Sequence, residues 1–328
     1  MNLHIPDVRI LEVHPCPIPH SETASSSCSG ERKELGVPLL LRAVKDAAAL
    51  GYNYLSVAGE EPMEYPSLAA ICREAHNHGM LTSMVTRKAR LSAAQLDWLR
   101  FSIDLLGVEV AGREQATRRI RRTHLGQTLE DRLGRIRDSG IPFAVVFPLN
   151  EGSLPELEWA AEFAAAQGAA MLQVRPSSRL SDPHMATAWM MIECMSELQR
   201  GKLVIHFDAV NRYGLPIEPS DLESWLRDLQ REARYLGEVV SPLVIEDDGG
   251  ISPVRHGFPR HFALGNLHEQ RLAAAVETWV EGRAAEFCDL YSKVLRQTRA
   301  ADRMFGDLYE MLAKAAADVR LGWSAAGC

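Results

Sequence analysis

The sequence predicts an α/β fold in which parallel strands alternate with helices and curl into a partial barrel. The first observation is a recurring order of amphipathic helix, glycine and short apolar strand, with the glycines at Gly51, Gly79, Gly140 and Gly168. Glycine takes the left-handed conformation that ends a helix, after which the chain turns into the sheet. The second observation is that these strands are nearly continuous apolar runs, as expected when helices cover a parallel sheet.

Strand-forming and helix-forming segments alternate strictly over the first two thirds of the chain. Strands are expected at 8–13, 53–58, 81–86, 105–110, 142–148, 170–175 and 203–208. Helices are expected at 37–50, 66–78, 92–101, 127–139, 154–167 and 184–199. Right-handed crossovers that all run in one sense curl a sheet, so these units favour a partial (β/α)6 barrel of the TIM type.

The alternation stops after Asn211, which predicts a barrel domain at 1–210 and a small α/β extension at 211–328. The extension should contain a helix at 221–236 and, around Asp-Asp-Gly-Gly at 247–250, a β-hairpin. Further helices are expected from 268 to 282 and onward to about residue 320.

Composition excludes several classes of function. The formal net charge of −7 argues against a nucleic-acid surface. The arginine-rich stretch 113–122 is an exception, and it is either a solvated helix face or a site for an anionic group. No segment approaches 18 consecutive apolar residues, and the first residues lack the pattern of a signal peptide. The six cysteines are scattered, so we expect a reduced, cytoplasmic protein without a membrane partner.

Several motifs resemble those of one family. The first strand and the entry to the long loop read VRILEVHP, and the second strand and its helix read NYLSVAGEEPMEYPSLAAICREAHNHGM. The third and fourth strands read LTSMVTRKARLS and LLGVEVAG. The later stretch DDGGISPVRHGFPRHFALGNL resembles the start of a SPASM-like extension. Together these segments resemble the radical SAM superfamily, in its peptide-modifying branch, over roughly residues 8 to 270. The resemblance implies a radical-SAM-like barrel and contacts to S-adenosylmethionine (SAM) from Gly59, Glu60, Glu61 and Pro62.

The loop after the first strand departs from that family. Its members carry three cysteines there, usually as CxxxCxxC, which hold a [4Fe–4S] cluster. The matching positions here fall at or near Pro19, Thr23 and Ser26. The second motif also has Glu60 in place of a glycine, the third and fourth strands end differently, and the extension has only Cys288 instead of a cysteine ladder. We therefore do not expect the standard cluster.

The same loop retains other potential metal ligands. Cys16, His20 and Cys28, with His14 beside them, form a mixed set that suits iron or zinc. The alternative is a loop without a metal, because SETASSSCSG has the composition of a flexible linker.

A third group consists of polar residues inside apolar strands. They are Ser83, Glu109, Gln173, Arg175, His206 and Asp208. Near the carboxyl ends of barrel strands, such side chains line a cavity, so Ser83 and Arg175 are candidate SAM contacts. Glu109 and Arg175 are candidates for an ion pair across that cavity, and Glu109, His206 and Asp208 are candidates for acid–base catalysis. A structural histidine is the alternative at position 206.

The leading functional hypothesis is a radical-SAM-like protein that has lost the cluster and the reductive cleavage of SAM. It would bind a substrate or ligand, or serve as the partner of an active paralogue or pathway enzyme, in peptide or natural-product modification. One alternative is an enzyme that uses the barrel cavity with a non-standard metal site or acid–base residues. Another is an active radical SAM enzyme with atypical ligation, so catalysis itself stays open.

Overall fold

A computed structural model describes residues 8–15, 35–59, 61–87, 91–114, 128–177, 180–198, 201–211, 219–300, 305–306 and 308–325. The residues group into two compact units. The terminal unit combines His4–Thr82 with Pro216–Ala300 and Tyr309–Cys328. The middle unit consists mainly of Ser83–Leu215 and Ala301–Leu308. Each unit combines segments that are far apart in sequence, and the domain boundary at residue 210 stays a prediction.

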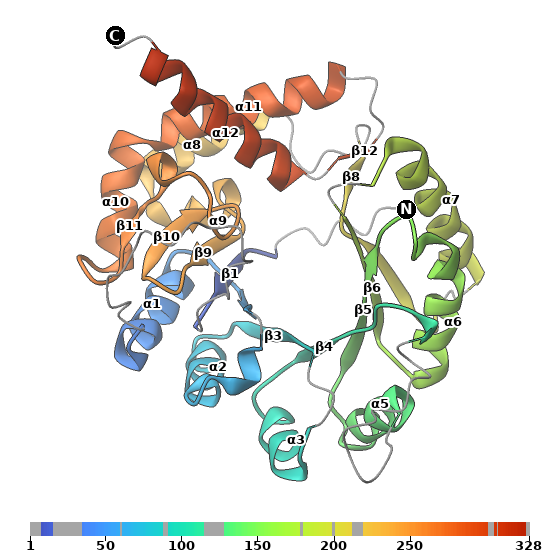
Figure 1. The fold of residues 1–328 in the computed structure, drawn as a ribbon. Helices are drawn as coiled ribbons and strands as arrows, with labels where there is room; N and C mark the ends of the chain where they lie inside the picture. Colours follow the sequence, from blue (N-terminus) through green and yellow to red (C-terminus); the bar gives the residue numbers. More distant parts are fainter. Residues whose placement is uncertain are drawn as a thin grey trace. The chain divides into compact units, whose positions relative to one another are not determined.

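In the terminal unit, strand β1 (Ile10–Val13) is an inner strand of the sheet (Figure 1). It pairs in parallel with β2 (Tyr54–Val57) on one side and with β9 (Leu243–Ile245) on the other. Strand β10 (Gly250–Pro253) runs antiparallel to β9, and β11 (Gly265–Asn266) runs antiparallel to β10. The predicted β9–β10 hairpin is therefore confirmed, and its first strand extends the parallel sheet at the edge of β1.

The helices of this unit are α1 (Val37–Ala49), α2 (Leu68–Asn77), α8 (Pro219–Arg231), α9 (Leu236–Val239), α10 (Leu272–Gly282), α11 (Ala284–Ala300) and α12 (Leu308–Ala325). They pack on one another, α1 against α2 and α10, and α8 against α11. Every second residue of β1 and β2 is buried, for example Leu11 and Val57, because successive strand side chains point to opposite faces. In the extension, Phe258, Phe262 and Phe287 pack edge to face, and Trp279 Nε1 donates to Phe262 O at 3.0 Å.

The middle unit repeats the pattern of parallel strands and helices. Its strands are β3 (Leu81–Thr86, from Ser83 onward), β4 (Leu105–Glu109), β5 (Phe143–Leu149), β6 (Met171–Pro176) and β7 (Val204–Phe207), each parallel to the next. Its helices are α3 (Ala93–Leu99), α5 (Leu129–Asp138), α6 (Leu157–Gln167) and α7 (Asp182–Leu198). A short antiparallel pair joins β8 (Val210–Asn211) to β12 (Phe305–Gly306).

Local sequence explains where these helices begin and end. Ser92 and Gln95 form a reciprocal capping box at α3, and Thr128 and Asp131 form another at α5. The four predicted glycines have positive φ angles of 90°, 74°, 77° and 76°, in chain order. Single 3-10 turns lie at Pro62–Glu64, Leu154–Glu156, Ala233–Tyr235 and Arg260–Phe262.

Two predicted helix boundaries in the extension are wrong. Helix α8 ends at Arg231 because Glu232 is extended, with φ −145° and ψ 118°. Helix α10 begins at Leu272, four residues after the predicted start, because Asn266 holds the preceding residues in a turn: its Oδ1 accepts from His268 N at 2.8 Å. No described helix combines the length and the apolar character needed to cross a membrane.

Candidate functional site

The carboxyl end of β1 carries a buried histidine. His14 follows the last strand residue and is 6 % exposed. Its Nε2 lies 2.6 Å from Glu12 Oε1, which lies on the same side of the strand. Its Nδ1 is buried and has no hydrogen-bond partner in the described structure. The carboxylate fixes the ring's orientation and leaves Nδ1 as an unsatisfied acceptor when Nε2 carries the proton.

His14 meets a second histidine from the C-terminal hairpin. The ring centroids of His14 and His256 are 4.7 Å apart, and the rings are tilted by 47°. Nε2 of His256 lies 3.6 Å from Asp247 Oδ1. The residue that follows β1 thus contacts the segment that follows β10, so two stretches far apart in sequence share one polar cluster.

Glu246 anchors that hairpin segment. It is 2 % exposed, and its Oε1 accepts from Ser252 Oγ at 2.7 Å and from Gly257 N at 2.9 Å. Arg260 Nη2 lies 2.7 Å from both Glu246 Oε2 and Asp248 Oδ2. A buried carboxylate with these partners is well satisfied, so its role here is to fix the fold of the loop that presents His256.

The end of β2 carries the residues predicted to contact SAM. Gly59 has φ +126°, and the position that a Cβ would take there has no atom within 4 Å. Glu61 is the N-cap of the 3-10 turn that starts at Pro62, and its Oε1 accepts from Met63 N at 3.3 Å. The glycine backbone is therefore open on one side, whereas the Glu61 carboxylate contributes to the turn. Glu60 lies outside the described residues.

In the middle unit, strand register places the predicted polar residues on one face of the sheet. Ser83 is opposite Leu105, which lies four residues before Glu109 on β4 and therefore on the same face, and Gln173 is opposite His206. Arg175 and Asp208 follow at alternate positions on the same face. The six side chains, Ser83, Glu109, Gln173, Arg175, His206 and Asp208, are half-buried or exposed. Alternation within a strand relates Gln173 to Arg175, whereas the common face of all six residues depends on the register between strands.

The ion pairs on this face differ from the predicted ones. Glu109 Oε2 accepts from Arg87 Nε at 2.9 Å, so the predicted pair of Glu109 with Arg175 is wrong. Arg175 instead donates from Nη2 to Gln173 Oε1 at 3.2 Å, and its Nε lies 3.9 Å from Asp208 Oδ2. The reason is strand order: Arg87 follows β3, which neighbours β4, whereas Arg175 lies on β6 with β5 between.

These contacts bear on the predicted acid–base residues. Glu109 is already paired with the guanidinium of Arg87. Asp208 is 45 % exposed in its side chain, and His206 is also exposed. The face therefore offers polar contacts to a ligand more readily than a shielded acid–base pair, and the catalytic role of Glu109, His206 and Asp208 stays a prediction.

The predicted metal ligands Cys16, His20 and Cys28 lie outside the described residues, as do residues 115–122 of the arginine-rich stretch. Among the residues that the structure describes, no group of three or more His, Cys, Asp and Glu side chains is arranged to hold a metal ion. Cys72 and Cys288 are buried, and Cys194 is exposed on α7. His14 is the one predicted metal ligand whose geometry is described.

Sequence reasoning missed the cluster of His14 with His256, and the pairing of Arg87 with Glu109. The only signal for the first was the resemblance of the hairpin to a family extension. The second was detectable in principle, because Arg87 directly follows the strand that precedes Glu109 in the barrel order.

Comparison with known proteins identifies the fold. No protein-family model matches the chain. The PqqA peptide cyclase of Ruegeria pomeroyi is 29 % identical over 183 residues, which are 49 % of this chain and 44 % of the cyclase. The match thus spans less than half of that relative.

Solved structures show the same fold over most of the chain. Streptococcus suis SuiB bound to S-adenosylmethionine has a TM-score of 0.60 and 12 % identity, covering 85 % of this chain and 65 % of SuiB. The enzyme anSMEcpe with bound AdoMet and Kp18Cys peptide has a TM-score of 0.55 and 13 % identity, covering 97 % of this chain and 99 % of that enzyme. These structural neighbours are radical SAM enzymes, so the predicted α/β fold of the radical-SAM-like partial-barrel class is confirmed.

Proposed function

We propose that this chain, which has the radical SAM fold, binds SAM and a peptide but does not cleave SAM reductively. In this role it is a substrate-binding or partner subunit of a peptide-modifying system, working beside an active enzyme. The observation that carries the proposal is the donor set of the loop between β1 and α1. That loop contains two cysteines, Cys16 and Cys28, where a radical SAM cluster needs three thiolates. The standard [4Fe–4S] cluster does not fit this set.

SAM binding is supported by the end of β2. The backbone at Gly59 has a conformation that favours glycine and an open side next to it. Backbone groups there would hold the amino-acid part of SAM, which supplies an ammonium and a carboxylate to bind. The Glu61 carboxylate accepts a hydrogen bond from Met63 N, so it stabilises the turn that follows this backbone.

A peptide ligand is supported by the relatives. SuiB has been solved with the precursor peptide SuiA, and anSMEcpe with the Kp18Cys peptide. The sequence relative is a cyclase of the peptide PqqA. Because these similarities cover only parts of SuiB and the cyclase, the peptide and the partner enzyme are proposals for this chain.

The test is a calorimetric titration of SAM into protein stripped of iron under anaerobic conditions. We expect one SAM per chain without any reconstitution. Gly59→Ala introduces a Cβ at a φ that costs about 1–2 kcal/mol for an L-residue and at the open side, so we expect at least tenfold weaker binding. Gly79→Ala is the matched control, since Gly79 also has a positive φ of 74° and open space but precedes β3. SAM binding that appears only after iron and sulfide are restored contradicts the proposal.

A further inference from the structure

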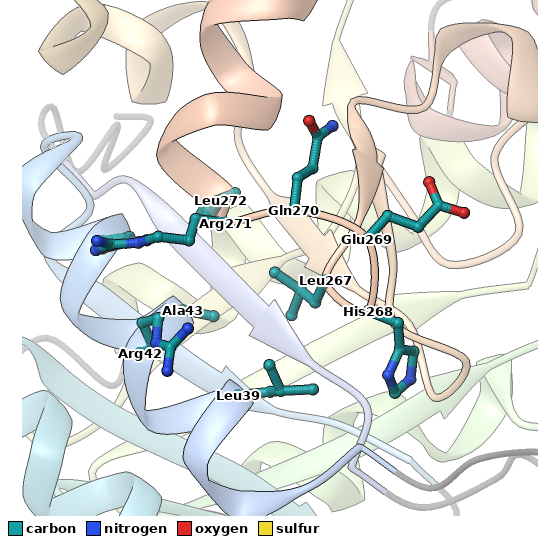
Figure 2. Close-up of a pocket in the computed structure, with 10 residues that line it drawn as sticks. Leu39, Arg42, Ala43, Leu267, His268, Glu269, Gln270, Arg271 and Leu272 are labelled. Carbon is teal, nitrogen blue, oxygen red and sulfur yellow. The ribbon is translucent and has the colours of Figure 1, made fainter.

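A pocket of about 270 Å³ lies in the terminal unit, on the side of α1 that faces α10 (Figure 2). One wall is a stripe of α1 formed by Leu39, Arg42, Ala43 and Asp46. These positions follow the i, i+3, i+4, i+7 spacing of one helix face. The other wall is the segment 267–272, which leads into α10. The residues that line the pocket include neither His14 nor His256, and none of the polar residues described for the middle unit.

An ion pair fixes the two walls to each other. Arg271 Nη2 lies 2.7 Å from Asp46 Oδ1, and its Nε lies 3.4 Å from Asp46 Oδ2. This two-point contact from a guanidinium to a carboxylate is the geometry that arginine prefers. Asp46 is 7 % exposed. Because Arg271 compensates its negative charge, Asp46 repels an anion in the pocket less than an unpaired carboxylate would.

Arg42 is the charge that remains available. Its side chain is exposed on α1, and in the part of the chain that the structure describes it has no hydrogen bond or ion pair. Figure 2 shows it on the wall opposite the 267–272 segment, with Glu269 and Gln270 pointing to the other side of that segment. Two acidic residues line the pocket: Asp46 is paired with Arg271, and the Glu269 side chain extends away from Arg42.

The floor beneath this cation is apolar. Ala43, Leu267 and Leu272 are buried, and Leu39 is half-buried beside them. The combination differs from a plain phosphate site, which would be polar throughout. It suits a ligand that places an apolar side chain on the floor and a carboxylate at the rim.

We propose that this pocket binds a short acidic peptide segment, with a Glu or Asp carboxylate on Arg42 and an adjacent Leu-like side chain on the apolar floor. Arginine recognises a carboxylate through two parallel N–H donors, which gives geometric preference as well as charge. The chain carries a formal net charge of −7, so its overall charge does not attract an acidic peptide. Binding of such a peptide therefore requires a local cation such as Arg42. The choice of a peptide rests on the proposed function, whereas the preference for a carboxylate rests on the pocket.

The experiment uses the full chain and two fluorescein-labelled probes, one with the sequence Gly-Leu-Glu-Leu-Gly and one with Gln in place of Glu. Binding is followed by fluorescence anisotropy at low salt, in the absence of SAM. We expect Arg42→Gln to weaken binding of the Glu probe about tenfold, as for a charge-assisted hydrogen bond. Lys45→Gln removes the same charge from an exposed position of the same helix outside the pocket, and binding should stay within about twofold of the unsubstituted protein.

Three outcomes overturn the proposal. Equal losses for Arg42→Gln and Lys45→Gln show general electrostatic attraction. Equal binding of the Gln probe shows an apolar site without carboxylate recognition. Complete displacement of the Glu probe by about 10 mM inorganic phosphate, which is enough to saturate a weak anion site, shows a simple anion site. A parallel SAM titration of Arg42→Gln separates this result from the proposed function, because SAM binding should be unchanged.

Discussion

The imidazole of His14 packs 4.7 Å from the imidazole of His256 and lies 2.6 Å, at Nε2, from Glu12 Oε1. The pair joins the end of β1 to the segment that follows the C-terminal hairpin. Because β9 also pairs with β1, the N-terminal strand is held by the extension through its backbone and through this side chain. The extension is therefore part of the structure that fixes the carboxyl end of β1 at His14.

Truncation of His14 should destabilise the fold. His14→Ala removes a buried ring, its packing on His256 and its hydrogen bond to Glu12, and we expect a loss of about 2 kcal/mol. The measurement is the urea midpoint followed by circular dichroism. His78→Ala is the control, because the His78 side chain is 31 % exposed and bonds only to Glu74 of its own helix. Equal losses in the two variants would show that the His14 cluster does not contribute.

Glu246 should matter more than its neighbours in the hairpin. Glu246→Ala leaves Ser252 Oγ and Gly257 N without their acceptor and breaks the pair with Arg260, so we expect about 3 kcal/mol of destabilisation. Ser252→Ala removes one donor only and should cost about 1 kcal/mol. Urea unfolding of both variants gives the comparison, and a Glu246→Ala loss no larger than that of Ser252→Ala contradicts this account.

Stability should fall in alkaline solution. Burial, with Asp289 nearby, raises the pKa of the Cys288 thiol from 9.0 to about 12, and burial raises the pKa of Tyr52 well above its usual value. A raised folded-state pKa means that the unfolded chain ionises first. The stability that comes from keeping these groups protonated and buried is thus fully present below about pH 8, and it is lost as the pH rises from 9 toward 12.

The check is the free energy of unfolding in urea between about pH 8 and pH 10.5, the range in which unfolded thiols ionise. Cys288→Ala should lower the overall stability but flatten its decline with pH, by at most about 1.4 kcal/mol per pH unit. Cys194→Ala, at an exposed cysteine, should leave the slope unchanged. A slope that Cys288→Ala does not alter is inconsistent with a buried, protonated thiol.

The pair of Arg87 with Glu109 should contribute little to stability. Their side chains are 61 % and 25 % exposed, and exposed ion pairs are worth less than about 1 kcal/mol. A double-mutant cycle with Arg87→Gln and Glu109→Gln should therefore give a coupling free energy below that value at 0.1 M salt, an ionic strength with a Debye length of about 10 Å. A coupling above about 2 kcal/mol would mean that water is excluded from this face more completely than the exposures indicate.

The sequence predicted the strands and helices well because their signals are local. An apolar run such as β5, or the capping box of Ser92 with Gln95, specifies its element without reference to distant residues. The common orientation of Gln173 and Arg175 followed from alternation within one strand.

The partners of those residues depended on strand order and on folded loops. Which cation meets Glu109 is decided by β3 lying next to β4, and alternation within one strand does not contain that information. His14 and His256 meet only because β9 adds to the edge of β1 and the chain then turns back at Val254, whose φ is +73°. Neither event leaves a local pattern.

Iron and acid-labile sulfide analysis after anaerobic reconstitution tests the absence of the cluster most directly. The protein is desalted, its visible spectrum recorded, and 5′-deoxyadenosine measured after addition of dithionite and SAM. With only Cys16 and Cys28 in the loop, we predict no stoichiometric sulfide and no 5′-deoxyadenosine above the protein-free control. Four irons and four sulfides per chain, as a [4Fe–4S] cluster requires, that disappear in the Cys16→Ala/Cys28→Ala double variant would contradict the account.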